Sequence, residues 1–169
     1  INIANGAVLS TSGVHSLGSN NYISIQGAGV NVDGLLNAQG IGTGRAGEIE
    51  LVATSGGDEI FIQNNGQLLA SSSSGSGGSI TYSGNVIQEG TSQVHTGANN
   101  QDGGTITITG NSGNSFTMQN NGILYANGRT TGTNSDAGTV TINTGTVNLG
   151  QGLIKTEGAS STGNAGTVT

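Results

Sequence analysis

Residues 61–82 read FIQNNGQLLASSSSGSGGSITY, and apolar residues recur at every second position in each of the three hydrophobic parts of this stretch. These parts belong to IFI at 60–62, GQLLA at 66–70 and GGSITY at 77–82. Alternation with a period of two residues is typical of a half-buried β-strand. Asn, Gly and Ser separate the parts, and these residues favour turns. The stretch therefore predicts three short strands joined by turns.

The same three segments recur along the whole chain. The first has the pattern small residue, Gly, any residue, β-branched residue, and its anchors are Ile23, Ile49, Ile80, Ile106, Val140 and Val168. These anchors span 145 residues in five steps, so the mean cycle has 29 residues. The second segment recurs at 1–3, 30–32, 60–62, 86–88, 116–118 and 147–149. The third, G-x-[LIV]-x-[AST], recurs at 6–10, 34–38, 66–70, 122–126 and 152–156, with a divergent copy at 93–96.

Strands this short cannot bury an apolar face alone, but they can do so when each cycle stacks on the next. No window has a convincing helical period, and the chain contains no Pro that would interrupt a ladder of hydrogen bonds. We therefore expect an all-β parallel β-helix (β-solenoid) of about six three-stranded coils with no helices. Residues 1–169 form one repeat array, which we interpret as a segment of a longer repetitive protein.

The apolar positions of the third segment predict one inward column of the core. Its members are Val8, Leu36, Leu68, Val94, Leu124 and Ile154, each followed two residues later by Ser, Ala or Thr. A small residue suits a corner where two sheets converge, because a large side chain would clash there.

The composition excludes several classes of function. Three basic residues stand against nine acidic ones, so the chain has no obvious phosphate-binding surface and we expect no nucleic-acid partner. Cys is absent, so no disulfide can form. No apolar run approaches the roughly 18 residues that a membrane-spanning helix needs, and we expect no membrane insertion.

The order of the phrases resembles the repeats of filamentous-haemagglutinin-like exoproteins, which are bacterial surface adhesins secreted by the two-partner route. These phrases are [GA]-G-x-[IV]-x-[IV], then NG-x-L-x-A, then G-x-G-x-[GA]-G, and they are clearest at 61–82 and 147–169. The resemblance covers essentially the whole chain and weakens in the first coil. The secretion domain of that family carries an NPNG-type motif, and this chain has no Pro, so the resemblance implies stalk. It also implies right-handed winding.

The resemblance implies an exported protein, extracellular or at the bacterial cell surface, that acts by attachment, matrix building or fibre formation. We therefore expect a structural and adhesive filament segment, not an enzyme, with no cofactor and no metal. The expected partners are further copies of the chain, arranged end to end or laterally, and surface glycans or receptors on cells.

One outward face suggests an alternative function. Thr105, Thr107, Thr139, Thr141, Thr167 and Thr169 form three T-x-T pairs in successive first segments. Regular T-x-T arrays on β-solenoids resemble ice-binding proteins, although Thr is also simply a good strand residue. Glu48 and Glu50 interrupt the array in an earlier coil.

The outward positions of the third segment form the most varied column. They are Leu9, Asn37, Leu69, His95, Tyr125 and Lys155, and they mix apolar, aromatic and basic groups. Exposed Leu side chains favour packing against a partner, so we interpret this column as a contact strip.

A corner lies between the second and third segments, where the tetrapeptide QNNG occurs at 63–66 and again at 119–122. Asn5, Asp33, Asn65, Glu89, Asn121 and Gln151 fall at this corner, and we expect them to form a ladder of stacked polar side chains. Asn and Gly tolerate left-handed backbone angles, so we expect such angles here.

A third alternative is a carbohydrate-active β-helix, which would need carboxylates that converge in a groove. Glu48, Glu50, Asp58 and Glu59 gather in one coil, with only Arg45 as a nearby basic residue. Asp102 and Asp136 each precede a first segment by three residues, so we expect them to stack at one corner. Turn formation or a Ca²⁺ bridge would each explain this pair, but the Ca²⁺-binding nonapeptide of β-helix repeats is absent.

Overall fold

The computed structural model describes residues 1–11, 21–41, 45–55, 57–72, 75–89, 93–95, 102–128, 135–158 and 164–169. Within these residues the chain forms strands and no helix, and the paired strands run parallel to each other. They build three sheets of six strands each. The predicted all-β parallel solenoid is therefore confirmed.

Each sheet takes every third strand, so one coil contributes one strand to each sheet. The first sheet contains β3 (Tyr22–Gly27), β6 (Glu48–Ala53), β9 (Ser79–Ser83), β12 (Thr105–Thr109), β15 (Thr139–Asn143) and β18 (Thr167–Val168). The second contains β1 (Asn2–Ile3), β4 (Val30–Val32), β7 (Glu59–Ile62), β10 (Asn85–Gln88), β13 (Ser115–Met118) and β16 (Thr146–Asn148). The third contains β2 (Val8–Ser10), β5 (Leu35–Asn37), β8 (Gln67–Leu69), β11 (Gln93–His95), β14 (Ile123–Tyr125) and β17 (Leu153–Lys155).

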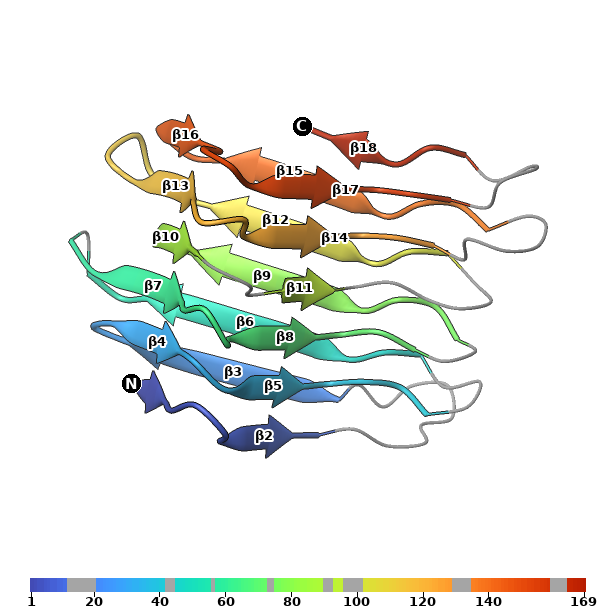
Figure 1. The fold of residues 1–169 in the computed structure, drawn as a ribbon, viewed down its shortest axis with the longest axis horizontal. Helices are drawn as coiled ribbons and strands as arrows, with labels where there is room; N and C mark the ends of the chain where they lie inside the picture. Colours follow the sequence, from blue (N-terminus) through green and yellow to red (C-terminus); the bar gives the residue numbers. More distant parts are fainter. Residues whose placement is uncertain are drawn as a thin grey trace.

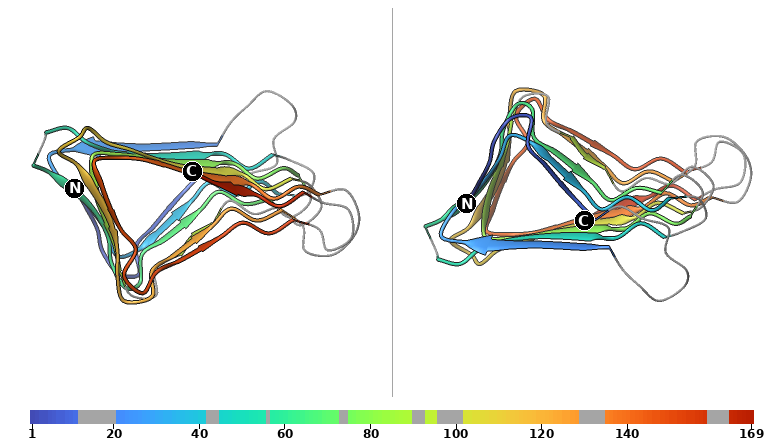
Figure 2. Two further views of the ribbon diagram at one scale, coloured as in Figure 1. Left: turned by 90° about the horizontal axis from the view of Figure 1, so that it is seen from above. Right: turned by 90° about the horizontal axis from the view of Figure 1, so that it is seen from below.

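The three sheets are the sides of a triangular prism, which Figure 2 shows along the coil axis. In Figure 1 the chain runs rightward along the front through the third sheet and returns leftward behind it through the first sheet. The coils climb from the N-terminal to the C-terminal end, so the winding is right-handed.

The register of the first sheet follows the anchors predicted from the repeat. Ile23 pairs with Ile49, Ile49 with Ile80, Ile80 with Ile106, Ile106 with Val140, and Val140 with Val168. The anchors from Ile23 to Val140 are buried, whereas Val168 is 52% exposed because it lies in the last coil. Fully burying such an aliphatic side chain contributes about 1.5–3 kcal/mol, so the anchor column is a main source of stability.

Two polar side chains lie among the aliphatic ones in the core. Gln88 takes the place between Ile62 and Met118 in the second sheet, and its side-chain amide donates a hydrogen bond to the Ile123 carbonyl at 2.6 Å. Tyr82 is fully buried in the first sheet, and its hydroxyl has no hydrogen-bond partner within the described residues. Burial raises the pKa of Tyr82 well above its ordinary value.

The corner between the third and first sheets requires small residues. Gly47 N donates to Ala38 O at 2.8 Å, and the same bond joins Gly78 to Ala70 and Gly138 to Ala126 at 2.9 and 2.8 Å. These bonds hold the incoming and outgoing parts of one coil together, and Ala38, Ala70 and Ala126 are completely buried between them. The predicted role of the small residues is confirmed in these three coils.

The predicted register of the first coil is wrong by one residue. Leu9 pairs with Leu36 and Ser10 with Asn37, so Leu9 belongs to the inward column and Ser10 to the outward one. Val8, predicted to point inward, pairs with Leu35 and is 63% exposed. The repeat pattern aligns Gly6 with Gly34, but in the structure Ala7 takes that position.

The cause is the position of the glycine in the corner before β2. Five positions separate Ile3 from Val8, as they separate Ile62 from Gln67, but Gly6 lies two residues before its strand whereas Gly66 lies directly before its own. Gly6 has a φ of +79° and forms a left-handed turn there.

Candidate functional site

The register brings the predicted T-x-T face together on the first sheet, which forms one straight side of the prism (Figure 2). One column contains Thr105, Thr139 and Thr167, and the next contains Thr107, Thr141 and then Thr169, which directly follows Val168. Ser79 and Thr81 extend both columns by one coil. The hydroxyl surface therefore covers four coils.

Charged and aromatic side chains replace this surface in the first two coils. The Tyr22 hydroxyl donates to Glu50 Oε2 at 2.6 Å, and the Ser24 hydroxyl donates to the same oxygen at 2.9 Å. The bond from Tyr22 lowers the pKa of Glu50 and raises the pKa of Tyr22, because it is strongest while Glu50 is ionised and Tyr22 is protonated.

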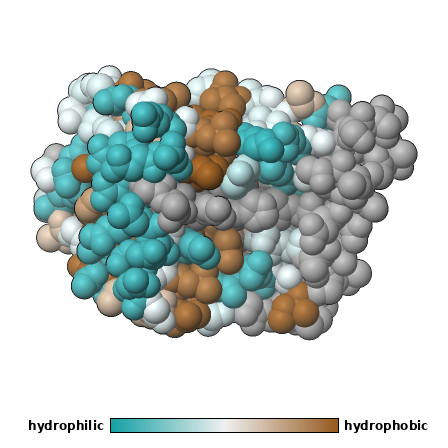
Figure 3. Space-filling view, viewed as in Figure 1, coloured by the Kyte–Doolittle hydropathy of each residue, from teal (hydrophilic) through white to brown (hydrophobic). Residues whose placement is uncertain are grey.

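The predicted contact strip on the third sheet contains Asn37, Leu69, His95, Tyr125 and Lys155 in one register column, with Ser10 in place of Leu9. Lys155 Nζ lies 5.9 Å from the centre of the Tyr125 ring and 2.9 Å from Glu157 Oε1. Only the backbone of His95 belongs to the described part of the chain. The face in Figure 3 carries hydrophobic patches beside hydrophilic side chains.

Of the predicted corner ladder, the structure shows a contact between Asp33 and Asn65, whereas Glu89 contacts residues outside the predicted set. Asn65 donates its backbone N–H and its side-chain amide to Asp33 Oδ1, at 3.2 and 3.1 Å. Glu89 lies two positions earlier in its coil than predicted and accepts from Gln119 at 3.1 Å and from Asn120 at 3.4 Å, not from Asn121.

The remaining ladder members are placed by the register. Asn5 is not level with Asp33, because the corner of the first coil is two residues longer than the corner of the second coil. Gln151 is level with Asn121, since Leu153 pairs with Ile123.

The two QNNG copies form turns with different backbones. Gly66 N donates to Gln63 O at 2.8 Å, and Gly122 N donates to Gln119 O at 3.0 Å. Asn120 and Asn121 have φ values of 51° and 64°, and they are the only described residues other than Gly with a positive φ. The left-handed angles predicted for this corner are therefore present in the second copy and absent from the first.

Asp102 and Asp136 lie in adjacent coils, as their spacing predicted. Asp102 Oδ1 accepts the backbone N–H of Asp136 at 3.0 Å. Asp136 Oδ1 in turn accepts the backbone N–H and side-chain amide of Asn164, at 2.8 and 3.0 Å. Each carboxylate thus accepts a hydrogen bond from the backbone of the next coil and does not close a turn in its own coil. Among the described residues no group of three or more His, Cys, Asp and Glu side chains could hold a metal ion.

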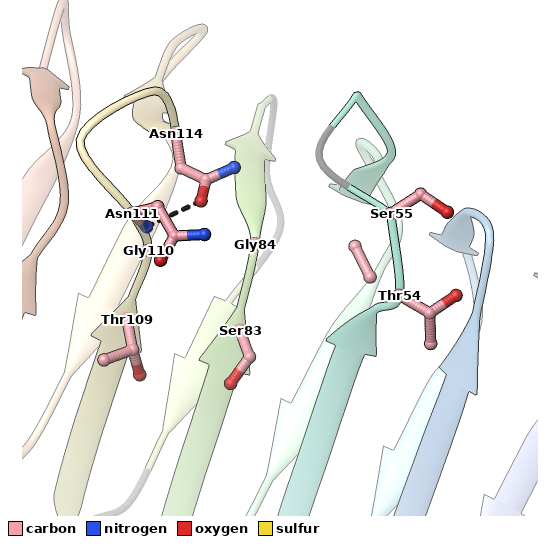
Figure 4. A pocket seen from close by; sticks show the side chains of 9 residues that line it. Thr54, Ser55, Ser83, Gly84, Thr109, Gly110, Asn111 and Asn114 are labelled. Atoms are coloured by element: carbon pink, nitrogen blue, oxygen red, sulfur yellow. Dashed lines mark hydrogen bonds between the residues drawn. The ribbon is translucent and has the colours of Figure 1, made fainter.

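Sequence reasoning missed a polar notch at the corner between the first and second sheets. The connections at this corner comprise two, five, one, five and two residues, at 28–29, 54–58, 84, 110–114 and 144–145. The one-residue connection at Gly84 therefore lies between two longer loops. The cavity above it has a volume of about 310 Å³. Figure 4 shows Thr54 and Ser55 on one side, Asn111 and Asn114 on the other, and Ser83 and Gly84 between them.

A second, more open hollow of about 520 Å³ lies beside the 54–58 loop on the second sheet. Phe61 lines it together with Asn2, Asn31, Asp58 and Glu59. Phe61 points outward, since its neighbours Ile60 and Ile62 are buried, so an aromatic side chain occurs on a face that the repeat pattern had not singled out.

Comparison with protein families, with curated proteins and with solved structures finds no match to this chain. None of the described segments forms a helix that is long and apolar enough to cross a membrane.

Proposed function

We propose that this chain is a structural and adhesive segment of a filament on a bacterial cell surface, similar to the stalk repeats of filamentous-haemagglutinin-like exoproteins. The observation that carries the proposal is the unbroken register of all three sheets through six coils. Each coil contacts mainly its two neighbours, so such an array can be extended by adding coils. A protein of this kind acts outside the cell as a stiff spacer that presents its side faces.

The partner that we propose at the coil ends is a second copy of the chain. Val8 and Leu9 are exposed at the N-terminal end, and Val147, Leu149 and Leu153 at the C-terminal end. Stacking β1 on β16, β2 on β17 and β3 on β18 would cover both sets and pair the free edges of all three sheets.

Sedimentation velocity over a range of concentrations, together with negative-stain electron microscopy, tests this proposal. We expect lengths in multiples of one unit, and we expect Val147→Lys to leave only single units. Val147 continues the inward column of Phe116 and is 46% exposed in a single unit, so stacking of a second unit would bury the added charge. Single units of the unmodified chain at every concentration would contradict end-to-end assembly.

Lateral association and attachment are proposed for the contact strip on the third sheet. The double variant Leu69→Lys, Tyr125→Lys should weaken lateral bundling or surface attachment while end-to-end lengths stay unchanged. Its behaviour is therefore the opposite of that expected for Val147→Lys, and the two variants are controls for each other. Unchanged bundling and attachment would exclude the strip.

The aligned threonine columns favour a second candidate function, an ice-binding face. The spacing along these columns is the strand spacing of about 4.8 Å, which gives a regular array of hydroxyl and methyl groups. Thermal hysteresis of the folded chain measures this function. Loss of hysteresis on Thr107→Lys would support it, and no hysteresis in the unmodified chain would exclude it.

A further inference from the structure

We propose that the notch over Gly84 binds a neutral saccharide. The notch is made by three coils, because β6 and its following loop form one wall, the 110–114 loop forms the other, and the end of β9 forms the floor. Strands are about 4.7–4.9 Å apart, so the two walls rise from coils that are roughly 9–10 Å apart. A volume of about 310 Å³ is at the low end for ligand pockets, which suits about one or two sugar rings.

The floor of the notch requires glycine. Gly84 has a φ of +127°, a backbone conformation that side chains of L-residues rarely adopt. A Cβ at this position would also lie 2.8 Å from the Cβ of Ala53. The backbone N–H of Gly84 donates to Thr109 O at 2.9 Å, and this bond holds the short connection against the next coil. Gly84 therefore adds no side chain to the floor.

The walls and the floor carry hydrogen-bonding groups that are not used within the protein. The hydroxyls of Thr54, Ser55 and Ser83 have no hydrogen-bond partner in the described part of the chain. The 110–114 loop is held by its own bonds, from Asn111 N to Asn114 Oδ1 at 2.7 Å and from Asn114 N to Asn111 O at 2.9 Å, so the Asn111 side chain is left for a ligand (Figure 4).

The chemistry of the lining selects the class of ligand. Hydroxyl and carboxamide groups both donate and accept hydrogen bonds, as sugar hydroxyls do. No charged side chain lines the notch, so neither a phosphate nor an acidic sugar would find a counter-charge there. The methyl groups of Ala53, Thr54 and Thr109 offer small apolar patches for the C–H face of a sugar ring. This inference rests on the proposed function and adds a second attachment site to the contact strip on the third sheet.

Amide-resolved NMR titration of the isolated chain tests the proposal. The probes are maltohexaose, cellohexaose, laminarihexaose and chitohexaose, with a heparin hexasaccharide as the charged comparator. We expect at least one neutral probe to give saturable shifts in the amides of residues 54–55, 83–84 and 109–114. The dissociation constant should be on the order of 1–10 mM, because few groups contact the ligand.

Two variants and one control show where the probe binds. Ser83→Phe should fill the notch and weaken binding at least tenfold, and Asn111→Ala should weaken it about fivefold. Asn111 is exposed and only its backbone takes part in the loop bonds, so this variant keeps the fold. Asn5→Ala removes an exposed carboxamide at another corner and should change nothing.

The proposal is overturned if no neutral probe gives saturable shifts, if the shifts lie elsewhere, if only heparin binds, or if Ser83→Phe and Asn111→Ala bind like the unmodified chain. Filament assembly does not enter this measurement. A chain that assembles without binding sugar therefore rejects the notch alone, and one that binds sugar without assembling rejects only the filament.

Discussion

At the scale of single residues, side-chain oxygens at the corners hold successive coils together. Five of them accept the backbone N–H of a residue one coil further on, in the pairs Asp33–Asn65, Asn85–Ser115, Asp102–Asp136, Asn127–Glu157 and Asp136–Asn164. A backbone N–H near a corner is turned away from the sheet ladder and would otherwise need water. The Asp and Asn residues at the corners therefore stabilise the stacking of coils more than the shape of individual turns.

Asp136 makes part of this stacking dependent on pH. The two hydrogen bonds from Asn164 hold the pKa of Asp136 below its ordinary value of 3.8. The stability that this carboxylate contributes is complete above pH 3.8 and is lost as the pH falls through the lower pKa of the folded state. Carbon-detected NMR should find the Asp136 carboxyl titrating below its ordinary range. Asn164→Ala removes the side-chain bond and keeps the backbone bond, so it should raise the pKa of Asp136 only part of the way. A normal pKa in the unmodified chain would contradict the bonds.

Removing the buried hydroxyl of Tyr82 should increase the stability of the protein. An unpartnered buried hydroxyl costs about 1–3 kcal/mol, so Tyr82→Phe should raise the free energy of unfolding by about 1 kcal/mol in denaturant titrations. Tyr22→Phe is the control, because that hydroxyl donates to Glu50 on the surface and its loss should not stabilise the protein. Lower stability of Tyr82→Phe would show that the Tyr82 hydroxyl has a partner.

The same residue should affect stability in alkali. Burial raises the pKa of Tyr82 above 10.0, so the folded state keeps a proton that the unfolded state releases. Stability should therefore be constant below pH 10.0 for this group and fall as the pH rises further, and Tyr82→Phe should remove that fall.

At the scale of elements, the glycines directly before β5, β8 and β14 are required by the close approach of the coil below, whose backbone oxygens a Cβ at Gly34, Gly66 or Gly122 would meet. A Cβ at Gly66 would clash with the carbonyl oxygen of Val32, although Gly66 itself does not have a positive φ. Gly66→Ala should therefore lower the free energy of unfolding by about 1–3 kcal/mol. Gly113→Ala is the matched control, because a Cβ there meets nothing within 4 Å.

Denaturant unfolding of the two variants measures this difference. Gly113→Ala should be neutral or raise stability by up to about 1 kcal/mol, since Ala restricts the unfolded chain. Equal effects of the two substitutions would mean that the glycines serve turn conformation only, as the sequence alone had suggested.

The elements that could be predicted from the sequence are those whose side chains repeat in every coil. The first-sheet anchors follow a clear pattern, so their register was correct in all six coils. The position of Leu9 could not be predicted, because two corners of different length align equally well by their glycines. The notch was also missed, since it depends on two long loops that are two coils apart and on a single short connection at Gly84.

At the scale of the whole molecule, the order of the strands determines how the array can be extended. The first strand, β1, belongs to the second sheet, and the last strand, β18, belongs to the first sheet. Each strand of the first sheet that is not the last is followed along the chain by a strand of the second sheet. A second copy placed after β18 would therefore continue the same strand order. Ile3 and Leu149 lie in the same inward column of the second sheet. Ile3 pairs with Val32 at the N-terminal end of the column. Asn148 pairs with Thr117, so Leu149, the next residue, is level with Met118 at the C-terminal end.

This order predicts the behaviour of a tandem fusion in which Thr169 is followed by a copy of residues 142–146 and then by Ile1 of a second copy. The five added residues restore the spacing that separates Val140 from Asn148, which are level with Val168 and Asn2 in the register. The junction should form a continuous ladder and bury Val147 and Leu149 beneath the second copy. In a linear array, stability is the sum of the coil terms and the interface terms, so one added interface should raise the unfolding midpoint. The m-value should also increase, because more surface is exposed in one cooperative step.

Replacing Ile3 by Lys in the second copy alone is the control, since it places a charge in the junction and leaves the first copy unchanged. That variant should unfold in two steps, with the first copy at the midpoint of the single chain. If the unmodified tandem unfolds at the midpoint and with the m-value of the single chain, the two copies do not stack. The end surfaces would then have no preference for each other, and end-to-end assembly would lose its structural basis.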